Sequence, residues 1–410
     1  MLTVIRILYN LLIFIFIPII LPLGYIAALW KKEEKDYFER FGFIKIDKNV
    51  EKSVWFHCAS VGEVRSLKIL INEIRKRYPD LAIVISTITY SGKEVAVKEL
   101  NPDVVFLLPI ENSLAIRYLI NYLNTKILFI VDTEIWPNLI LTASKIIPLV
   151  MINARISDRS FKNYYRMKFI FSYLLTKFQK IFVKSEDDFL KFERILGGKN
   201  NLELLGNLKF FEKKEVHVDD LDFLNGRLIT AGSTHRGEEE LILGAYKEVK
   251  NSFDKLIIVP RHINRVEEIV RLTKSFNFNV SKWSEGVDNC IQSEVIVVDK
   301  FGMLEKFYKI SEKVFVGGSI VTNIGGHNIF EALQFRKVIA CGDNMWNFKE
   351  IYDLAKRYDL IYPVKSKKDF IDYFENNIKL SPDFDSFEKE LKEKATNKLT
   401  KIFEYMSTAL

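Results

Sequence analysis

Short apolar segments alternate with amphipathic segments from residue 53 onward, and this alternation constrains the fold more than any other feature. The first series of apolar segments covers 53–59, 81–87, 127–132, 147–153, 181–186 and 202–208. Between the first two, residues 66–78 place leucine and isoleucine at helical spacing. Strands separated by helices form parallel sheets with helices on both faces. The pattern therefore predicts a doubly wound α/β domain.

The alternation restarts after residues 211–226, a polar segment without a clear period that we interpret as an interdomain linker. The second series covers 228–234, 255–262, 294–299, 313–319 and 337–343. A chain of 410 residues is also longer than one ordinary domain. We predict two Rossmann-like domains, over 33–215 and 216–410, with a charged terminal helix that packs back on the first.

The N-terminal segment, residues 1–32, is predicted to be a membrane anchor. The 24 residues from 7 to 30 carry no charge, and a helix of ~20 apolar residues is long enough to cross a bilayer. Pro18 and Pro22 leave open a kinked segment that lies in one leaflet, and a buried core helix is a further alternative. Lys31, Lys32 and Lys35 follow directly, which favours a cytoplasmic location for the rest of the chain.

Several classes of protein are disfavoured by motifs and composition. The three cysteines share no metal-like spacing and are odd in number, which argues against a disulfide framework. The histidines form no close-spaced ligand set, so we expect no metal and no cofactor. Neither GxxxxGK[ST] nor GxGxxG after the first strand is present, which argues against a kinase or a dehydrogenase. The net charge of +7 permits anionic partners but identifies none.

Polar and small residues recur where the predicted strands end. Because ligands of open parallel sheets bind at the carboxyl ends of the strands, we expect these residues to line a cleft between the two domains. In the first domain they are Ser60, Gly62, Glu63 and Asp132. In the second domain they are Ser233, Thr234, His235, Pro260, Arg261, Gly318 and Ser319.

Glu63 has two interpretations. Residues 60–63, SVGE, match the S-x-x-E capping box, in which serine and glutamate satisfy free N–H groups at the start of a helix. A glutamate that follows the first strand can instead act as a general base toward a bound substrate. The local sequence alone favours the structural role.

The second domain contains a glycine-rich segment, GGSIVTNIGGHNIFEAL, over 317–333. Glycine turns ahead of a helix expose N–H groups to a phosphate, which makes Gly326 and His327 candidates. Asn328 and Glu331 are three residues apart and would share one helix face, where the carboxylate accepts hydrogen bonds from a ribose or stabilises the helix dipole. Arg261 suits a phosphate, although arginines after strands commonly pair with surface acids.

A basic and aromatic stretch runs from Arg155 to Lys184, with eight Lys or Arg and a single acid, Asp158. Such a helix can lie on an anionic membrane or hold a phosphorylated lipid, it can contact RNA, or it can pack in the core with a basic outer face. The predicted anchor favours the lipid interpretation, so we assign Arg155 and Arg159 to the acceptor or the membrane and expect no nucleic acid.

Taken together, the motifs resemble the Kdo transferases of Gram-negative bacteria, which move 3-deoxy-D-manno-octulosonic acid (Kdo) from CMP-Kdo to a lipid A precursor. The matching segments, in the family's order, are ASVGE (59–63), DTEIWPN (132–138), NARIS (153–157), GNLKF (206–210), STHRGEEE (233–240), VPRH (259–262), FVGGS (315–319) and GGHNIFEA (325–332). They extend over nearly the whole chain.

The resemblance implies a GT-B fold, with the acceptor on the first domain and the nucleotide on the second. It implies that Glu63 is the general base and that Lys209 stabilises the transition state, with Asp132 beside them in the catalytic group. The segments that match the family's CMP-binding residues are Pro260 and Arg261, Phe301, Gly302 and Met303, and Asn328, Ile329, Phe330 and Glu331. Two positions depart from the family pattern: Asp132 replaces a glutamate, and Phe301-Gly302-Met303 replaces methionine, glycine and glutamate.

We therefore expect an inverting glycosyltransferase that adds Kdo to a lipid A precursor (lipid IVA) in lipopolysaccharide core synthesis. Its catalytic domains would lie on the cytoplasmic face of the inner membrane. Two alternatives remain: a GT-B enzyme that uses a UDP-sugar and a lipid acceptor, and a non-catalytic membrane adaptor that binds nucleotide.

Overall fold

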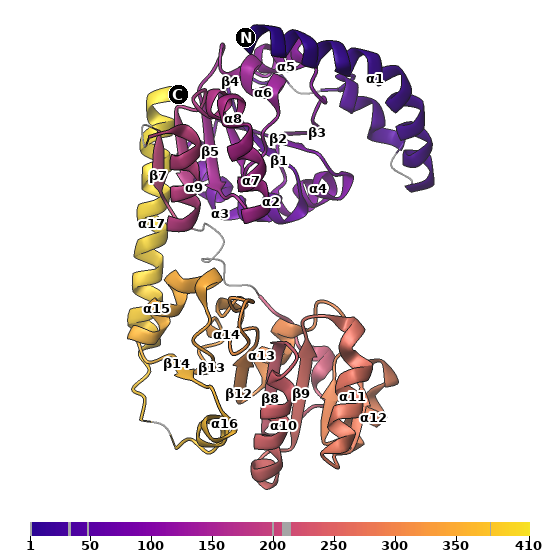
Figure 1. Ribbon diagram of the computed structural model, residues 1–410, viewed down its shortest axis with the longest axis vertical. Coiled ribbons are helices and arrows are strands. Elements are labelled where there is room, and N and C mark those ends of the chain that lie inside the picture. Colours follow the sequence, from indigo (N-terminus) through magenta and orange to yellow (C-terminus); the bar gives the residue numbers. More distant parts are fainter. Residues whose placement is uncertain (1, 32–33, 47–48, 199–200, 207–214, 378) are drawn as a thin grey trace. The chain divides into compact units, whose positions relative to one another are not determined.

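The computed structural model describes residues 2–31, 34–46, 49–198, 201–206, 215–377 and 379–410. The chain forms two compact units, each described separately below (Figure 1). The first comprises Met1–Phe211 and Lys394–Leu410, and the second comprises Glu212–Glu393. The chain therefore contributes to the first unit twice, before and after the second unit.

The first unit is built on a parallel sheet of seven strands among its described residues, in the order β3-β2-β1-β4-β5-β6-β7. The strands are β1 (Ser53–Cys58), β2 (Ala82–Thr87), β3 (Val104–Leu107), β4 (Thr125–Val131), β5 (Leu149–Ala154), β6 (Lys180–Val183) and β7 (Leu202–Leu204). The helices are α1 (Leu2–Lys31), α2 (Val61–Ser66), α3 (Lys68–Arg77), α4 (Tyr90–Val95), α5 (Ser113–Tyr122), α6 (Pro137–Ala143), α7 (Asp158–Arg166), α8 (Lys168–Leu175) and α9 (Glu186–Leu196).

Successive residues of the central strands enter apolar clusters on opposite faces of this sheet, as strand geometry requires. Trp55 belongs to one cluster, while Val54 and Phe56 belong to the other. All six residues of β1 are buried, as expected for a parallel strand covered by helices on both faces. The end of α17 (Phe384–Ala409) completes the second cluster with Leu399, Ile402, Phe403 and Met406.

The second unit has the same architecture, with a parallel sheet of seven described strands in the order β10-β11-β9-β8-β12-β13-β14. The strands are β8 (Leu228–Thr234), β9 (Lys255–Pro260), β10 (Val280–Lys282), β11 (Val295–Val297), β12 (Lys313–Val316), β13 (Ile339–Cys341) and β14 (Ile361–Pro363). The helices are α10 (Glu238–Val249), α11 (Val266–Ser275), α12 (Val287–Gln292), α13 (Leu304–Ile310), α14 (Phe330–Leu333), α15 (Lys349–Arg357) and α16 (Lys367–Phe374).

The predicted fold class is confirmed: each unit is a doubly wound α/β domain. Three short strands, β3, β10 and β14, were not predicted. They have 4, 3 and 3 residues, and so short a segment has no measurable period. The equally short β7, β11 and β13 could be predicted because they lie within the longer apolar segments 202–208, 294–299 and 337–343.

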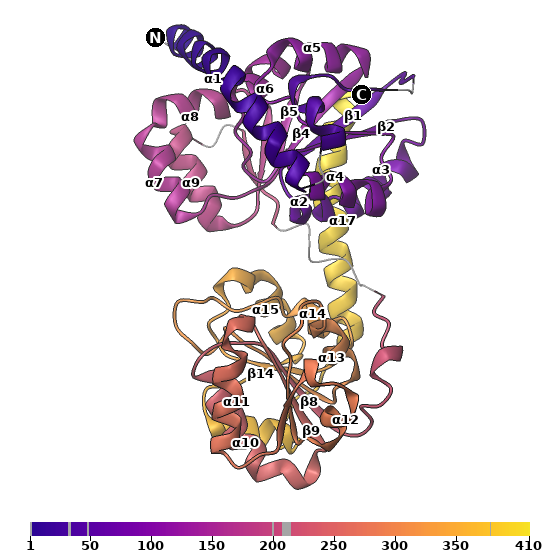
Figure 2. The same cartoon turned by 90° about the vertical axis from the view of Figure 1, so that its right-hand side faces the viewer.

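Residues 2–31 form a single helix, α1, which runs along the outside of the first unit (Figure 2). One side of this helix contacts the protein: Asn10 accepts a hydrogen bond of 2.6 Å from Asn138, and Tyr25 packs on Tyr37 and Phe38. Within the described part of the chain, no helix has the length and apolar character needed to cross a membrane. The predicted membrane-anchor helix over 1–32 is therefore not supported.

Candidate active site

In the first unit, the predicted residues follow neighbouring strands of the sheet. Glu63 follows β1, Asp132 follows β4 and Arg155 follows β5, and these three strands are adjacent. The carboxyl ends of parallel strands meet at one edge, which brings together side chains that are far apart in the sequence.

Glu63 is 7% exposed, at the start of α2, and its carboxylate is held at both oxygens. The backbone N–H of Ala59 donates to one oxygen at 2.6 Å, and the Ser60 hydroxyl donates to the other at 2.7 Å. The predicted capping box is therefore wrong in its details, because the serine side chain makes no cap to the helix N–H groups and is turned toward the glutamate instead. Gly62 lies between them in the first turn of α2.

Three carboxylates influence one another at this edge. Burial raises the pKa of Glu63, the two hydrogen bonds oppose that rise, and the charge of Asp132 adds to it. Burial also raises the pKa of Glu134, with further contributions from Glu63 and Asp132. The buried Cys58 thiol has its pKa raised by burial and then by the same three acids. A carboxylate with a raised pKa is a stronger base once it has lost its proton.

Asp132 is 8% exposed and pairs with Arg155, whose Nε lies 2.9 Å from the carboxylate. Its backbone has a positive φ of 57°, and Asn153, at the end of β5, has a φ of 55°. Left-handed backbone at non-glycine residues costs energy and is concentrated at functional sites. Arg159 lies on α7 with an exposed side chain. Lys209 falls outside the described residues.

In the second unit, four adjacent strands, β11, β9, β8 and β12, end at the edge where the other predicted residues lie. Ser233, Thr234 and His235 lie at the end of β8, and Pro260 and Arg261 at the end of β9. Ser233 has a positive φ of 54°, and the buried Thr234 hydroxyl has no hydrogen-bond partner among the described residues. The Arg261 side chain is exposed.

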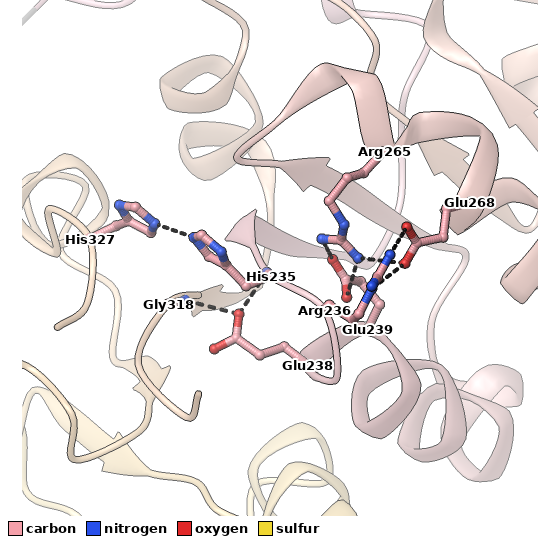
Figure 3. Close-up of polar contacts among 8 residues, drawn as sticks. All are labelled: His235, Arg236, Glu238, Glu239, Arg265, Glu268, Gly318 and His327. Carbon is pink, nitrogen blue, oxygen red and sulfur yellow. Dashed lines mark hydrogen bonds and ion pairs between the residues drawn. The ribbon is translucent and has the colours of Figure 1, made fainter. Parts of the chain in front are cut away.

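Glu238 holds two of these loops together (Figure 3). Its carboxylate is fully buried and accepts hydrogen bonds from the backbone N–H groups of His235, Gly318, Ser319 and Ile320 at 2.9 to 3.1 Å. The first of the two glycine turns predicted to bind phosphate, at Gly318, is therefore already occupied by the Glu238 carboxylate. The Ser319 side chain is likewise used internally, since its hydroxyl donates to the Val316 carbonyl at 2.7 Å.

The second glycine turn is packed inside the unit: Gly325 and Gly326 are buried, and the Gly326 N–H donates to the Gly318 carbonyl at 2.8 Å. Gly325 and Gly326 have positive φ values of 85° and 74°, and a Cβ at Gly326 would lie 2.1 Å from the Met345 sulfur. Asn328, just before α14, accepts a hydrogen bond from the Phe330 N–H at 3.2 Å. The Asn328 amide donates to Glu331 at 3.1 Å, so the two side chains meet as the spacing predicts. Ile329 is buried.

The predicted nucleotide-binding segment after β11, residues 301–303, contains both exposed and buried side chains. Phe301 is 77% exposed, and Gly302 has a positive φ of 80°. Met303 is buried in an apolar cluster beside Phe307, so its side chain is committed to the core. Any nucleotide contact at this segment falls to the Phe301 side chain or to the backbone of Gly302.

His235 and His327 form the most direct side-chain contact at this edge. Their Nε2 atoms are 2.8 Å apart, and the rings are nearly parallel, with 9° between their planes. Gly318 makes this possible, because a Cβ there would lie 2.8 Å from the His327 ring. Among the described residues, no group of three or more His, Cys, Asp or Glu side chains is placed to hold a metal ion.

The sequence analysis assigned no role to two residues of these sites. Glu134 lies in the DTEIWPN segment, two residues after Asp132, and its position after β4 was the available signal. Glu238 lies in the STHRGEEE segment, where three consecutive glutamates begin a helix. Nothing in that run distinguishes the buried Glu238 from Glu240, which is exposed.

Two Rossmann-like units of this kind make up the GT-B fold. A glycosyltransferase of solved structure from Rickettsia africae has the same fold: it is 14% identical, aligns over 88% of this chain and 99% of its own, and has a TM-score of 0.54. This likeness concerns the fold alone.

The chain belongs to the 3-deoxy-D-manno-octulosonic acid transferase (Kdo transferase) family. The family model for 3-deoxy-D-manno-octulosonic-acid transferase matches residues 35–212. The Kdo transferase of Rickettsia bellii is 30% identical over 90% of both chains. A bifunctional glycosyltransferase/methyltransferase of Fusobacterium nucleatum is 35% identical over 83% of this chain, which spans only 55% of that longer protein. The predicted family and enzyme class are confirmed.

Proposed function

We propose that this Kdo transferase uses CMP-Kdo as the donor and a lipid A precursor as the acceptor, in lipopolysaccharide core synthesis. The proposal rests mainly on the surroundings of Glu63. It is a buried carboxylate with a raised pKa, held by Ala59 and Ser60 at the end of β1. In the proposed reaction Glu63 takes the proton from an acceptor hydroxyl as that oxygen attacks the anomeric carbon of Kdo.

The bond from the anomeric carbon to the phosphate oxygen breaks in the same step, and CMP leaves with the electron pair. We assign stabilisation of this leaving group to Arg261, whose side chain is exposed. The Glu331 carboxylate, oriented by Asn328, is suited to accept hydrogen bonds from the ribose hydroxyls.

The deciding experiment is incubation of the protein with CMP-Kdo and lipid IVA, followed by mass spectrometry of the lipid. Addition of Kdo supports the proposal. Turnover of UDP-sugars in place of CMP-Kdo would replace it with another GT-B activity. Nucleotide binding without transfer from any donor would replace it with the adaptor function.

The pH profile tests the role of Glu63 through its neighbours. We expect kcat/KM for the acceptor to fall as pH decreases through a pKa above the ordinary glutamate value, because the base must be deprotonated. Asp132→Asn removes a neighbouring negative charge and should lower this pKa. The positive charge of Arg155 lowers the pKa of Glu63, so Arg155→Ala should raise that pKa. Shifts of the same sign in both variants, or none in either, would contradict the assignment.

We further propose that the first unit lies on the cytoplasmic face of the inner membrane through α1. Ten large apolar side chains of this helix are exposed, and an apolar surface of this kind marks an interaction site. They are Ile7, Leu11, Leu12, Phe14, Ile15, Phe16, Leu23, Ile26, Leu29 and Trp30. The basic side chains Arg155 and Arg159 would add attraction to anionic lipid.

The exposed side chains of α1 provide the test. We expect Phe14→Asp combined with Trp30→Asp to reduce co-sedimentation with anionic vesicles by about tenfold or more, because each side chain is more than half exposed and would lose apolar contact with lipid. Leu190→Asp with Val287→Asp changes two exposed apolar residues elsewhere and serves as the control. An equal loss in both double variants, or in neither, would contradict membrane attachment through α1.

A further inference from the structure

Three histidines of the second unit come together from distant parts of the sequence. His235, His262 and His327 follow β8, β9 and β12, which are adjacent in the sheet. His235 and His327 share the Nε2 contact of 2.8 Å described above and shown in Figure 3. The His262 ring meets His235 edge to face, with 5.7 Å between ring centroids.

The contact between two Nε2 atoms restricts where protons can be. One nitrogen must donate and the other must accept, so a neutral pair carries one proton between the rings and one on a single Nδ1. One added proton occupies the other Nδ1 without breaking the contact. The pair then has a positive charge and two Nδ1–H donors. A second added proton would require the rings to separate.

Neither Nδ1 has a hydrogen-bond partner among the described residues, so both nitrogens are available to a ligand. The two rings are half-buried, and His262 and Arg261 beside them are exposed. The rings meet end to end, with 5.1 Å between their centroids, so the two Nδ1 atoms lie at opposite ends of the pair and an oxyanion would accept a hydrogen bond from one of them.

Charged groups of both signs surround the pair. Arg261, His262 and Arg265 disfavour its protonation, and burial is the larger effect. Together they lower the pKa of His327 to about 4 and also lower that of His235, so the empty pair is neutral at pH 7.

The acids packed against the pair are already engaged. The Glu238 carboxylate is used by four backbone N–H groups, including that of His235. Glu239 and Glu268 pair with Arg265 at 2.8 and 3.3 Å. Arg261 has no ion-pair partner among the described residues. Arg236 also pairs with Glu268, so Arg261 is the cation with which an incoming anion could pair.

We propose that the His235–His327 pair binds an oxyanion of the nucleotide-sugar donor and takes up one proton when it does so. The proposal rests on the function proposed above. It adds a binding site for an oxyanion of the donor and the uptake of a proton when that oxyanion binds. An anion stabilises the charged pair, and by linkage the charged pair binds the anion more tightly. CMP-Kdo offers two such groups, the phosphodiester and the sugar carboxylate.

Isothermal titration calorimetry of the full chain with CMP-Kdo, without acceptor, tests this. The enthalpy at pH 7 is measured in buffers of different ionisation enthalpy, such as PIPES and Tris. We expect uptake of about one proton per donor bound, because the neutral pair becomes singly protonated. The dissociation constant should rise by up to about tenfold per pH unit toward alkaline pH, once the complexed pair begins to lose that proton. Binding without proton uptake would overturn the inference and leave the proposed function intact.

Variants and ligand fragments complete the design. His327→Asn and His235→Asn each remove one partner and should both abolish the uptake, whereas His217→Asn, in the segment before the second sheet, should retain it. Uptake that persists in both pair variants would overturn the inference. Free Kdo and CMP separate the two sources: the ligand whose uptake falls in His327→Asn relative to the unaltered protein carries the recognised anion. Absence of any CMP-Kdo binding by the unaltered protein would overturn both this inference and the proposed function.

Discussion

Glu63→Gln is expected to lower kcat for Kdo transfer by ~10² to 10⁴-fold, while the dissociation constant for CMP-Kdo stays unchanged. Glutamine has the same shape as glutamate but cannot take a proton from the acceptor. It can keep both local contacts, because its carbonyl accepts from the Ala59 N–H and its amide donates to the Ser60 hydroxyl. Stability should therefore change little. Steady-state kinetics, calorimetric CMP-Kdo binding and thermal unfolding measure the three quantities.

Glu73→Gln is the matched control for this substitution. Glu73 lies on α3 of the same unit and pairs only across the helix surface with Lys76, at 2.6 Å. It should retain full activity. If Glu63→Gln keeps half of the activity of the unaltered protein at the same melting temperature, Glu63 is a structural residue of α2 and the base lies elsewhere.

Glu238→Ala is expected to lower the free energy of unfolding of the second unit by about 4 kcal/mol or more. The substitution leaves four backbone donors without a partner, and each buried unsatisfied donor costs about 1 to 3 kcal/mol. Gly318 and His235 lie in the two loops that this carboxylate joins, so CMP-Kdo affinity should fall as well. Urea unfolding and nucleotide binding provide the measurements.

Glu240→Ala, two residues away on the exposed side of α10, should have little effect on either quantity. Glu238→Gln refines the comparison, since it retains one acceptor oxygen of the two and should be intermediate. If the alanine variant at 238 unfolds at the same urea concentration as the variant at 240, the four hydrogen bonds do not hold the loops.

The sheets could be predicted from the sequence because their central strands are six or seven residues long and mostly apolar. Segment 53–59 becomes β1, and 228–234 becomes β8, with boundaries that differ by at most one residue. The edge strand β14 has only three residues, and one of them, Pro363, is exposed. The rest of the sheet determines that β14 pairs with β13, and the local sequence does not indicate this pairing.

The sites could be predicted only as positions along a sheet edge. The strand ends indicated that Glu63, Asp132 and Arg261 would lie at such edges, since parallel strands align their termini. Which side chains touch depends on rotamers and on contacts across long separations. The contact between His235 and His327 joins residues 92 positions apart. The four donors to Glu238 come from the backbone, and a sequence pattern records only side chains.

The first unit is built from two separate parts of the chain, one before and one after the second unit, and this order matters during protein synthesis. Leu399, Ile402, Phe403 and Met406 belong to the same apolar cluster as Val54 and Phe56, yet the ribosome adds them only after the entire second unit. Until then, part of one face of the first sheet lacks its cover, and the nascent chain exposes apolar residues of β1 and its neighbours. Exposed surface of this kind invites aggregation or chaperone binding. The first unit is thus the first to be synthesised and the last to close.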